Sequence, residues 1–562
     1  MRRIAFVLAA SLASACWLAS CGGGGGSSAP ETLPSGSDGP ASTTLSASSG
    51  EITAFGSVFV NGHEFSTQGA QIVDNDTGDA VADASALEVG MSVDVKPMAA
   101  TALDAATPRA AEIRLHPLAR GYVDASDTTA STLSVMGQTV QLTSATNFSD
   151  RRACVTATTS PCTAVAGLSD LATTSGAASP GSYVTVHGFL FSASGSGANI
   201  VATLVSVGDA PGAGQAAFKA EGAVVTAGAT SVSIGGLNVD LSHATCWGTN
   251  GTMSCASAFS AGQVVSVFSA TAPALPATTF TAAVAALRSR LPVQTVGATI
   301  ELQGRVSSAS GTGFVLRGVN IDGAALAAAS LPAVGDDVRV TGTVAAGGTG
   351  ITASAIKLLH AAASRSLAVE GDFTAVAAGA GANTYVVTVL GQSINVNAST
   401  RLADRSTWMA PRSGSQAFNI TSFQTVLAAS TSKHLVVSAA ADATGQLTAV
   451  ALRIVPASSG AAVQGVVDAT PAPVNGGSAA SPSKFAIHGL TVSADPATFA
   501  SPRGWRLRAQ ATTVAAGDLV VARGSWSGGQ LVVAVPGGAS GPTLSNFVVD
   551  LGTPRTGDPC DF

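Results

Sequence analysis

Residues 57–65, SVFVNGHEF, decide the fold class of this chain. Apolar and polar residues alternate on both sides of Asn61-Gly62, and Asn-Gly in such a setting is the strongest short-range signal for a β-hairpin. The reason is that a type I′ turn needs positive φ at both of its central positions. Equivalent turns centre on Gly137, Gly236, Gly318, Gly391 and Gly489. The sequence therefore predicts a hairpin that recurs about six times.

The hairpin belongs to a longer repeat. Each copy opens with a Gly that lies two residues before an apolar side chain: Gly50, Gly121, Gly222, Gly304, Gly371 and Gly465. After the hairpin, several copies carry a Thr beside a large apolar residue: Thr146, Thr245, Thr400 and Thr498. A Gly then starts another alternating strand in most copies, and a last strand begins with Ala in several. This pattern predicts an all-β fold of tandem small antiparallel β-barrel or curled-sheet modules, arranged as beads on a string.

The repeats set the expected domain boundaries. We expect a lipoprotein signal peptide at residues 1–20, then a lipidated Cys and a Gly/Ser-rich tether at 21–49. Modules 1 to 6 are expected at residues 50–118, 119–211, 219–292, 300–362, 367–457 and 462–538, with a C-terminal tail at 539–562. Helical periodicity is nearly absent, and residues 281–290 are the only modest helix candidate.

Composition excludes several classes of protein. Only 11% of the 562 residues are charged, against about 25% in typical soluble proteins. The 46% of apolar residues provide enough surface for a core, which argues against a charged disordered chain. A net charge of -6 without a basic patch makes nucleic acid an unsuitable partner.

The N-terminus predicts export and lipidation. Arg2 and Arg3 precede a short apolar run at residues 4–17, which is too short to span a bilayer permanently. The next residues, LASC at 18–21, resemble the lipobox of bacterial lipoproteins, and this resemblance implies cleavage before Cys21 and acylation of its thiol. Gly22 favours transport to the cell outer membrane, with the protein facing the periplasm or the cell surface. The alternative is an ordinary secretory signal in which Cys21 occurs by chance.

The other cysteines fit an oxidising compartment. Cys154 and Cys162 lie close together in the sequence, as do Cys246 and Cys255, so we expect two local disulfides. A metal site is the rival interpretation, but only His243 lies near a pair and leaves the ligand set incomplete. Cys560 is then left over, either free or paired between molecules.

A few polar residues are candidate ligands. Asp74, Asp76 and Asp79 resemble part of a calcium loop, although Asp, Asn and Gly also form ordinary turns and position 85 is Ser rather than Glu. The interpretation as a turn is favoured. The seven His are expected to be solvent-facing strand residues. Four tryptophans have two interpretations: they are aromatic platforms that bind sugar, or they are anchors in the core. They are Trp247, Trp408, Trp505 and Trp526.

Four segments carry a family resemblance. FGSVFVNG (residues 55–62), LEVGMSVDV (87–95), LSVMGQTV (133–140) and VLGQSI (389–394) resemble the DUF5666 family. Its members are bacterial envelope proteins of uncharacterised function, often lipoproteins with tandem copies. The resemblance implies an all-β repeat, and it supplies no catalytic residues.

Motifs for common enzyme chemistry are missing from the sequence: there is no nucleophile elbow, phosphate-binding loop or dinucleotide fingerprint. We therefore expect a non-enzymatic, outer-membrane-anchored lipoprotein with a scaffold or binding role. It would need no cofactor, calcium being the weak exception. Its partners would be the membrane, through the lipid, and an envelope protein or polysaccharide. The alternative is a periplasmic or surface hydrolase or carbohydrate-acting enzyme with a site between modules.

Overall fold

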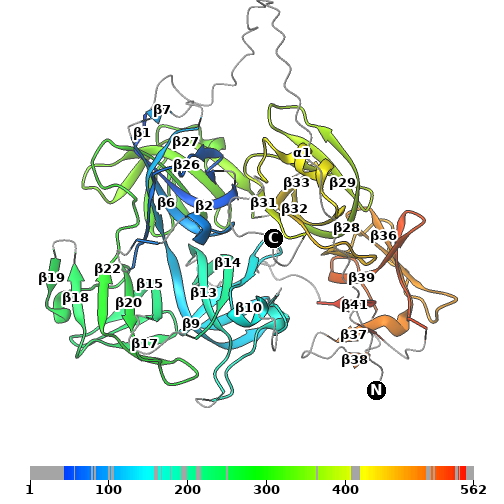
Figure 1. Cartoon of the computed structure of the whole chain (residues 1–562), viewed down its shortest axis with the longest axis horizontal. Coiled ribbons are helices and arrows are strands. Elements are labelled where there is room, and N and C mark those ends of the chain that lie inside the picture. Colours follow the sequence, from blue (N-terminus) through cyan, green and yellow to red (C-terminus); the bar gives the residue numbers. More distant parts are fainter. Residues whose placement is uncertain are drawn as a thin grey trace, which may run out of the picture. The chain divides into compact units, whose positions relative to one another are not determined.

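The computed structural model describes the chain between residues 44 and 551, all of it within the unit Ser42–Phe562. The residues left out inside that range are 56, 77–79, 82–83, 99–100, 103–106, 129, 157–161, 166, 177–178, 192–198, 211–216, 249–250, 363–364, 407–417, 443, 502–507, 510–512, 538–541 and 544. Strands dominate the described part, in three large sheets and one two-stranded ribbon (Figure 1). The prediction of an all-β protein with several modules is confirmed.

The first large sheet joins modules 1 and 4. Its strands are β2 (Ala47–Phe55), β3 (Val58–Val60), β4 (His63–Phe65), β5 (Gln71–Asp74), β6 (Ser92–Pro97), β8 (Ala110–Leu115), β23 (Thr299–Ser310), β24 (Gly313–Leu316), β25 (Val319–Asp322), β26 (Asp337–Val344) and β27 (Gly350–His360). The two modules meet where β2 pairs in parallel with β23, with Ala47 opposite Ile300. The separate ribbon consists of β1 (Thr44–Leu45) and β7 (Thr101–Ala102).

The second sheet joins modules 2 and 3, drawn in cyan and green in Figure 1. Its strands are β9 (Pro117–Asp127), β10 (Thr132–Val135), β11 (Gln138–Gln141), β12 (Asn147–Asp150), β13 (Tyr183–Leu190), β14 (Ile200–Gly208), β15 (Phe218–Ala227), β16 (Ser231–Ile234), β17 (Leu237–Asp240), β18 (Thr245–Gly248), β19 (Gly251–Met253), β20 (Val264–Ser269), β21 (Thr279–Thr281) and β22 (Val284–Leu287). Here the joining strands, β9 and β15, are antiparallel.

The third sheet joins modules 5 and 6 through the antiparallel pair β28 and β34. Its strands are β28 (Arg365–Ala378), β29 (Tyr385–Val389), β30 (Gln392–Val396), β31 (Arg401–Asp404), β32 (His434–Ala441), β33 (Leu447–Ile454), β34 (Ala461–Val466), β35 (Ser483–Ile487), β36 (Leu490–Ala494), β37 (Phe499–Ser501), β38 (Arg508–Ala509), β39 (Leu519–Ser527), β40 (Gln530–Val533) and β41 (Phe547–Asp550). The described helices are α1 (Phe423–Ala429) and the 3₁₀ turns η1 (Ala84–Ala86), η2 (Ala153–Thr156), η3 (Leu168–Asp170), η4 (Cys255–Ser257), η5 (Ala328–Ser330) and η6 (Pro496–Thr498).

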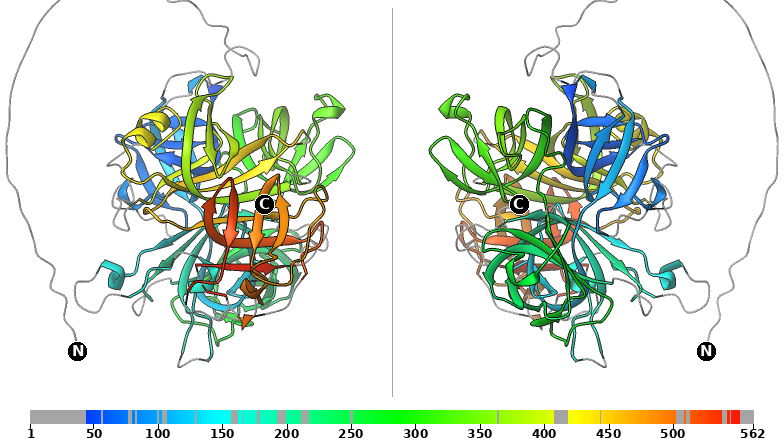
Figure 2. Two further views of the ribbon diagram at one scale, coloured as in Figure 1. Left: turned by 90° about the vertical axis from the view of Figure 1, so that its right-hand side faces the viewer. Right: turned by 90° about the vertical axis from the view of Figure 1, so that its left-hand side faces the viewer.

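The modules share one order of strand pairing. In module 4 the ring runs β23, β24, β25, β27, β26 and back to β23, with β25 and β27 parallel. Modules 2 and 5 close in the same way, through β9 with β10 and through β28 with β29. The strands of these rings curl round in both views of Figure 2. This order, first-second-third-fifth-fourth, is that of the five-stranded OB-fold barrel.

The Thr that follows the hairpin has a structural reason. It precedes or begins a further strand parallel to the module's last strand, as β12 lies against β14 and β31 against β33. The hydroxyl of Thr146 donates to the carbonyl of Ala202 at 2.8 Å, and the hydroxyl of Thr400 donates to that of Ala449 at 2.9 Å. Each Thr thus fixes the chain at the point where it turns back onto the sheet.

The Gly that opens each module is required by close packing. A Cβ on Gly121 would lie 2.7 Å from the side chain of Met136, and one on Gly371 would lie 2.5 Å from Leu390. Met136 and Leu390 are the first residues of their hairpin turns and have positive φ, 52° and 47°. The hairpin therefore folds directly over the opening strand, where only Gly leaves room.

The helix expected at residues 281–290 is wrong. These residues contain the end of β21, the whole of β22 and an irregular segment through Arg288 and Arg290. Strand β22 pairs with β20 on one side and β18 on the other. Hydrogen bonds to two neighbouring strands outweigh the helix propensity of its alanines.

The hydrophobic cores follow the shared sheets. Modules 2 and 3 have one continuous core, as do modules 5 and 6, whereas modules 1 and 4 keep separate cores. Ala54 and Phe59 of module 1 pack into the core of modules 5 and 6. Modules that are distant in the sequence are therefore in contact, in addition to those that follow one another along the chain.

Candidate functional site

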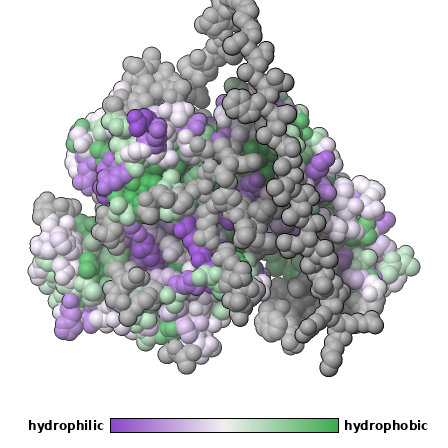
Figure 3. Space-filling model, viewed as in Figure 1, coloured by the Kyte–Doolittle hydropathy of each residue, from purple (hydrophilic) through white to green (hydrophobic). Residues whose placement is uncertain are grey.

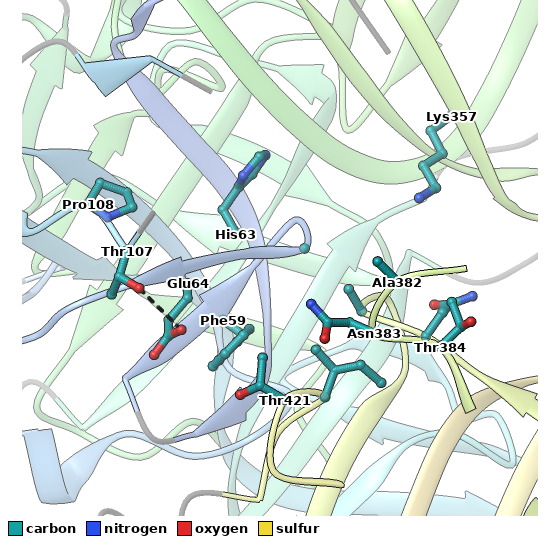
Figure 4. A pocket seen from close by; sticks show the side chains of 14 residues that line it. Phe59, His63, Glu64, Thr107, Pro108, Lys357, Ala382, Asn383, Thr384 and Thr421 are labelled. Carbon is teal, nitrogen blue, oxygen red and sulfur yellow. Dashed lines mark hydrogen bonds between the residues drawn. The ribbon is translucent and has the colours of Figure 1, made fainter. Parts of the chain in front are cut away.

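A cleft of about 470 Å³, lined by both polar and apolar side chains, lies where modules 1, 4 and 5 meet (Figure 4). Module 1 contributes the β3–β4 hairpin and the segment before β8, module 4 contributes β27, and module 5 contributes its turns. The lining residues are Phe59, Gly62, His63, Glu64, Thr107, Pro108, Lys357, Ala382, Asn383, Thr384, Asn397, Ala398, Ile420 and Thr421. Figure 4 shows Glu64 on one side of the cleft, and Lys357 and Asn383 on the other.

His63 is held in place by a buried carboxylate. Its Nε2 lies 3.2 Å from both carboxylate oxygens of Glu301, on β23 of module 4. The His63 side chain is 24% exposed and that of Glu301 only 3%. Hydroxyls of Ser48 and Thr341 also donate to Glu301, at 3.4 and 3.3 Å. The imidazole therefore has a fixed orientation at the wall of the cleft.

The other polar groups of the cleft differ in whether they already form hydrogen bonds within the protein. The Thr421 hydroxyl donates to the Asn419 amide oxygen at 2.7 Å, and that of Thr384 donates to the Gly381 carbonyl at 2.6 Å. Asn383 is exposed, and its amide makes no hydrogen bond within the described part of the chain. Phe59 adds an apolar surface. The cleft thus presents amide, imidazole, carboxylate and ammonium groups beside apolar carbon. The opposite charges of Glu64 and Lys357 suit a ligand that is polar but neutral overall.

Among the described residues, a Ser hydroxyl lies near a His imidazole in the interior, away from this cleft. The Oγ of Ser92 is 3.5 Å from Nδ1 of His187, and it donates to the carbonyl of His116 at 2.6 Å. Burial and the charges of nearby Arg and Lys side chains lower the pKa of His187 to about 3. His187 is 3% exposed, so substrate does not reach it. This geometry suits a structural role.

The expectation that the histidines face solvent is wrong for His187 and for His434, which is 1% exposed. His434 Nδ1 lies 2.8 Å from Asp372, and its Nε2 lies 3.4 Å from Glu370. The hydrogen bond to Glu370 outweighs burial and raises the pKa of His434. His187 lies against Ser92 of module 1, and His434 lies against the carboxylates of Glu370 and Asp372.

The two expected disulfides are formed. Cys154 and Cys162 are joined with an S–S distance of 2.01 Å, and Cys246 and Cys255 with one of 2.07 Å. Each bridge follows the hairpin of its module, in the connection that leads to the fourth strand of the ring. Cys21 and Cys560 lie outside the described residues.

The calcium candidates are used in ion pairs. Asp74 pairs with Arg120, and Asp76 lies 2.5 Å from the Nζ of Lys219. Burial would raise the pKa of Asp74, but the Arg120 charge and the Asp76 backbone amide keep it below its usual value. Asp79 lies outside the described residues, and the described part holds no group of three or more ligands for a metal ion. The backbone amide of Asp76 donates to the Asp74 side-chain carboxylate at 2.8 Å, a bond that is typical of a turn.

A buried ionic junction around Lys219 is the feature that sequence reasoning missed. Lys219 is 1% exposed; its Nζ lies 3.0 Å from Glu221 and donates to the carbonyl of Pro117. Arg290 reaches the other oxygen of Glu221 at 2.9 Å. A signal was present, because a charged residue stands next to the opening Gly in most modules: Glu51, Arg120, Glu221, Arg305 and Glu370.

The tryptophans do not form a repeated platform among the described residues. Trp247 is 45% exposed on β18, whereas Trp526 packs against the core of modules 5 and 6. Trp408 and Trp505 lie outside the described residues.

The described surface carries apolar side chains singly. On the face that Figure 3 shows, hydrophobic and hydrophilic residues are interspersed. The exposed large apolar residues are Met98, Val225, Trp247, Met253, Val296, Val334, Leu358 and Val474. Among the helices that the structure describes, none has the length and apolar character needed to cross a membrane.

Comparison with known proteins identifies one of the modules. Residues 120–205 match a family described as a domain of unknown function, DUF5666. This range runs from β9 to β14, so the DUF5666 domain here corresponds to the five-stranded ring of module 2 together with β12. No curated protein matches the chain.

Proposed function

We propose that the protein is a lipoprotein of the bacterial outer membrane, anchored through Cys21, whose β-modules form a non-enzymatic binding scaffold. Its ligand is a neutral segment of an envelope polysaccharide, held in the cleft beside His63. The observation that carries this proposal is the position of the cleft on module 1. It covers the β3–β4 hairpin, the second and third strands of the ring, and the segment between the fourth and fifth strands.

OB-fold barrels bind oligosaccharides and oligonucleotides on the same face, formed by the second and third strands and the adjoining loops. This is an analogy of fold, and the chemistry of the cleft decides between the two ligands. A phosphate backbone is bound mainly by Lys and Arg, and Lys357 is the single such residue among the described residues that line the cleft. Glu64 and the Glu301 carboxylate behind His63 outweigh its charge and disfavour phosphate. Hydroxyls of a sugar can accept from Asn383 and donate to Glu64.

Contacts between modules support a preformed cleft. Arg339 of module 4 donates to the carbonyl of Asn61 in the hairpin turn. Asn419 of module 5 donates to the carbonyl of Phe55 at 3.0 Å. Both bonds fix the backbone beside the cleft, so the ligand need not order it on binding.

The test of the cleft is binding of purified envelope glycans, including peptidoglycan fragments, measured by calorimetry. We expect the double variant Glu64→Gln/Asn383→Ala to bind about tenfold more weakly, as two lost hydrogen bonds predict. Thr230→Ala is the matched control, because Thr230 is exposed on module 3 and lies outside the cleft. Equal affinity of wild type and the double variant would overturn the cleft proposal.

The anchor is tested separately by cell fractionation. Cys21→Ala should release the protein from the membrane fraction and remove the acyl chains, which mass spectrometry detects. Retention of that variant in membranes with its lipid would contradict the proposal.

The alternative, a carbohydrate-acting enzyme, has one observation in its favour: His63 is oriented by Glu301 and lies next to Glu64. Chromatography of the glycans after long incubation separates the two proposals. Intact glycans support a binding protein, whereas shortened glycans, no longer formed by His63→Gln, support the enzyme.

A further inference from the structure

A second, much smaller cavity lies where modules 1 to 4 meet. Its volume is about 20 Å³, and we call it the arginine cavity after Arg288, Arg290 and Arg317 in its wall. Glu221 and Asp94 also line it. A space of this size holds a single particle about as large as water.

Arg290 has unused donors at this cavity. Its Nη1 donates to Glu221 at 2.9 Å, but Nε and Nη2 are buried without a hydrogen-bond partner in the described part of the chain. Arg288, in contrast, is occupied, since its Nε donates to the Ser266 hydroxyl at 3.0 Å. A buried guanidinium with two unsatisfied donors is costly unless an acceptor occupies the adjoining space.

The charges around the cavity do not balance. Apart from His116, which lies 2.8 Å from Asp94, its wall and the adjoining junction contain five cationic and four anionic side chains: Arg120, Lys219, Arg288, Arg290 and Arg317 against Asp74, Asp76, Asp94 and Glu221. Burial would raise the pKa of Asp94, but interactions led by the one with His116 lower it to about 2, so this carboxylate is charged. Burial lowers the pKa of Arg290 to about 10, where it still carries its proton at neutral pH. The cationic side chains of this set therefore exceed the anionic ones by one.

The neighbouring groups do not remove this excess. Arg151 is paired with Glu88 at 2.9 Å, which makes that pair neutral. His187 is neutral at pH 7 because burial and nearby cations lower its pKa to about 3. Arg317 donates to the Ser49 hydroxyl at 2.8 Å and is stacked on the Phe189 ring, and both partners are uncharged.

We propose that the arginine cavity binds one small monovalent anion, with chloride as the natural probe, accepting from Nε and Nη2 of Arg290. The volume excludes phosphate and sulfate, whose four oxygens need far more space. The anion supplies the missing negative charge and both missing acceptors. It stabilises the junction of modules 1 to 4, and this role does not depend on the ligand of the cleft beside His63.

The experiment compares thermal unfolding in sodium chloride and sodium gluconate at equal ionic strength. We expect the midpoint of the wild type to rise with chloride and to saturate, because a ligand bound only to the fold stabilises it. Arg290→Gln should lose this difference between the two salts. Arg523→Gln, which breaks an ion pair with Glu370 in modules 5 and 6, should keep it.

Crystals of the wild type soaked in bromide provide a measurement that needs no variant. An anomalous peak within hydrogen-bonding distance of Arg290 Nε supports the proposal. A site that contains only water, or identical unfolding of the wild type in chloride and gluconate, would overturn it.

Discussion

The junction around Lys219 and the cleft beside His63 are made of the same kinds of side chain, but water reaches only one of them. At the junction, Lys219 and Glu221 are 1% and 4% exposed and satisfy each other. In the cleft, Glu64 and Asn383 face an open space of about 470 Å³. The comparison teaches that polar residues between modules have two uses: where charges pair in the interior they hold modules together, and where they face solvent they can bind a ligand.

The largest expected effect is at the junction. Lys219→Met should lower the free energy of unfolding by about 3–5 kcal/mol, because Asp76 and Glu221 would lose the buried cation between them. Denaturant unfolding followed by circular dichroism measures this loss. Lys433→Met, at an exposed lysine, is the control and should change stability by less than about 0.5 kcal/mol. A loss below about 1 kcal/mol in Lys219→Met would mean that the junction does not hold the modules together.

This junction also shows where prediction from sequence ends. The hairpins and the strand opened by the Gly that follows each recurring Thr were predictable, because turn chemistry and alternation are local. In FKAEGAVV (residues 218–225) the same alternation makes Lys219 and Glu221 look solvent-facing. They are buried because Asp76 of module 1 and Arg290 lie against this face of β15, which is a central strand of a sheet shared by two modules. Pairing between modules is not encoded in local periodicity.

The cleft was unpredictable for a related reason. Of the polar residues that line the cleft, only His63 was considered from the sequence as a candidate site residue. As one of the seven His, it was expected to be a solvent-facing strand residue. Glu301, which orients it, is 238 residues away in the chain. Proximity of this kind arises from the parallel pairing of β2 with β23, which joins modules separated by two others.

The second largest effect concerns the disulfides. Cys246→Ser/Cys255→Ser should cost about 2–3 kcal/mol, since the bridge closes a short loop and the Cys246 side chain is buried in the core of modules 2 and 3. Cys154→Ser/Cys162→Ser should cost less, because Cys154 is only half-buried. Calorimetric unfolding of both variants under oxidising conditions tests this order. Equal losses would show that loop closure, which differs little between sequence separations of 8 and 9 residues, dominates over burial.

A smaller effect depends on pH, at the cluster of Glu370, His434 and Arg523. The pKa of His434 is raised from 6.5, so its stabilising contribution is present below pH 6.5 and is lost as the pH rises through the folded value. Burial would raise the pKa of Glu370, but hydrogen bonds from His434 and Arg523 lower it from 4.5 to about 2. The contribution of Glu370 is therefore present above pH 4.5 and is lost as the pH falls toward 2.

The cluster should therefore stabilise modules 5 and 6 most between pH 4.5 and pH 6.5. We expect His434→Gln to lose about 1.5 kcal/mol near pH 5.5 and less at pH 8. Unfolding of both proteins at a series of pH values measures the difference. A difference that grows from pH 5.5 to pH 8 would show that neutral His434 is the stabilising form, contrary to the geometry.

The smallest effect on stability is expected in the cleft. Glu64→Gln/Asn383→Ala should lower the free energy of unfolding by only about 1 kcal/mol. Ala is disfavoured at the positive φ of Asn383, 52°. No strong side-chain contact is lost, because Asn383 has no partner in the described part of the chain and Glu64 has only the exposed Thr107, at 3.4 Å. The same variant should weaken glycan binding about tenfold. A destabilisation as large as that of Lys219→Met would show that the cleft, like the junction, serves to hold modules together. A loss of stability of no more than about 1 kcal/mol, together with weakened binding, would separate the two uses of polar residues within one molecule.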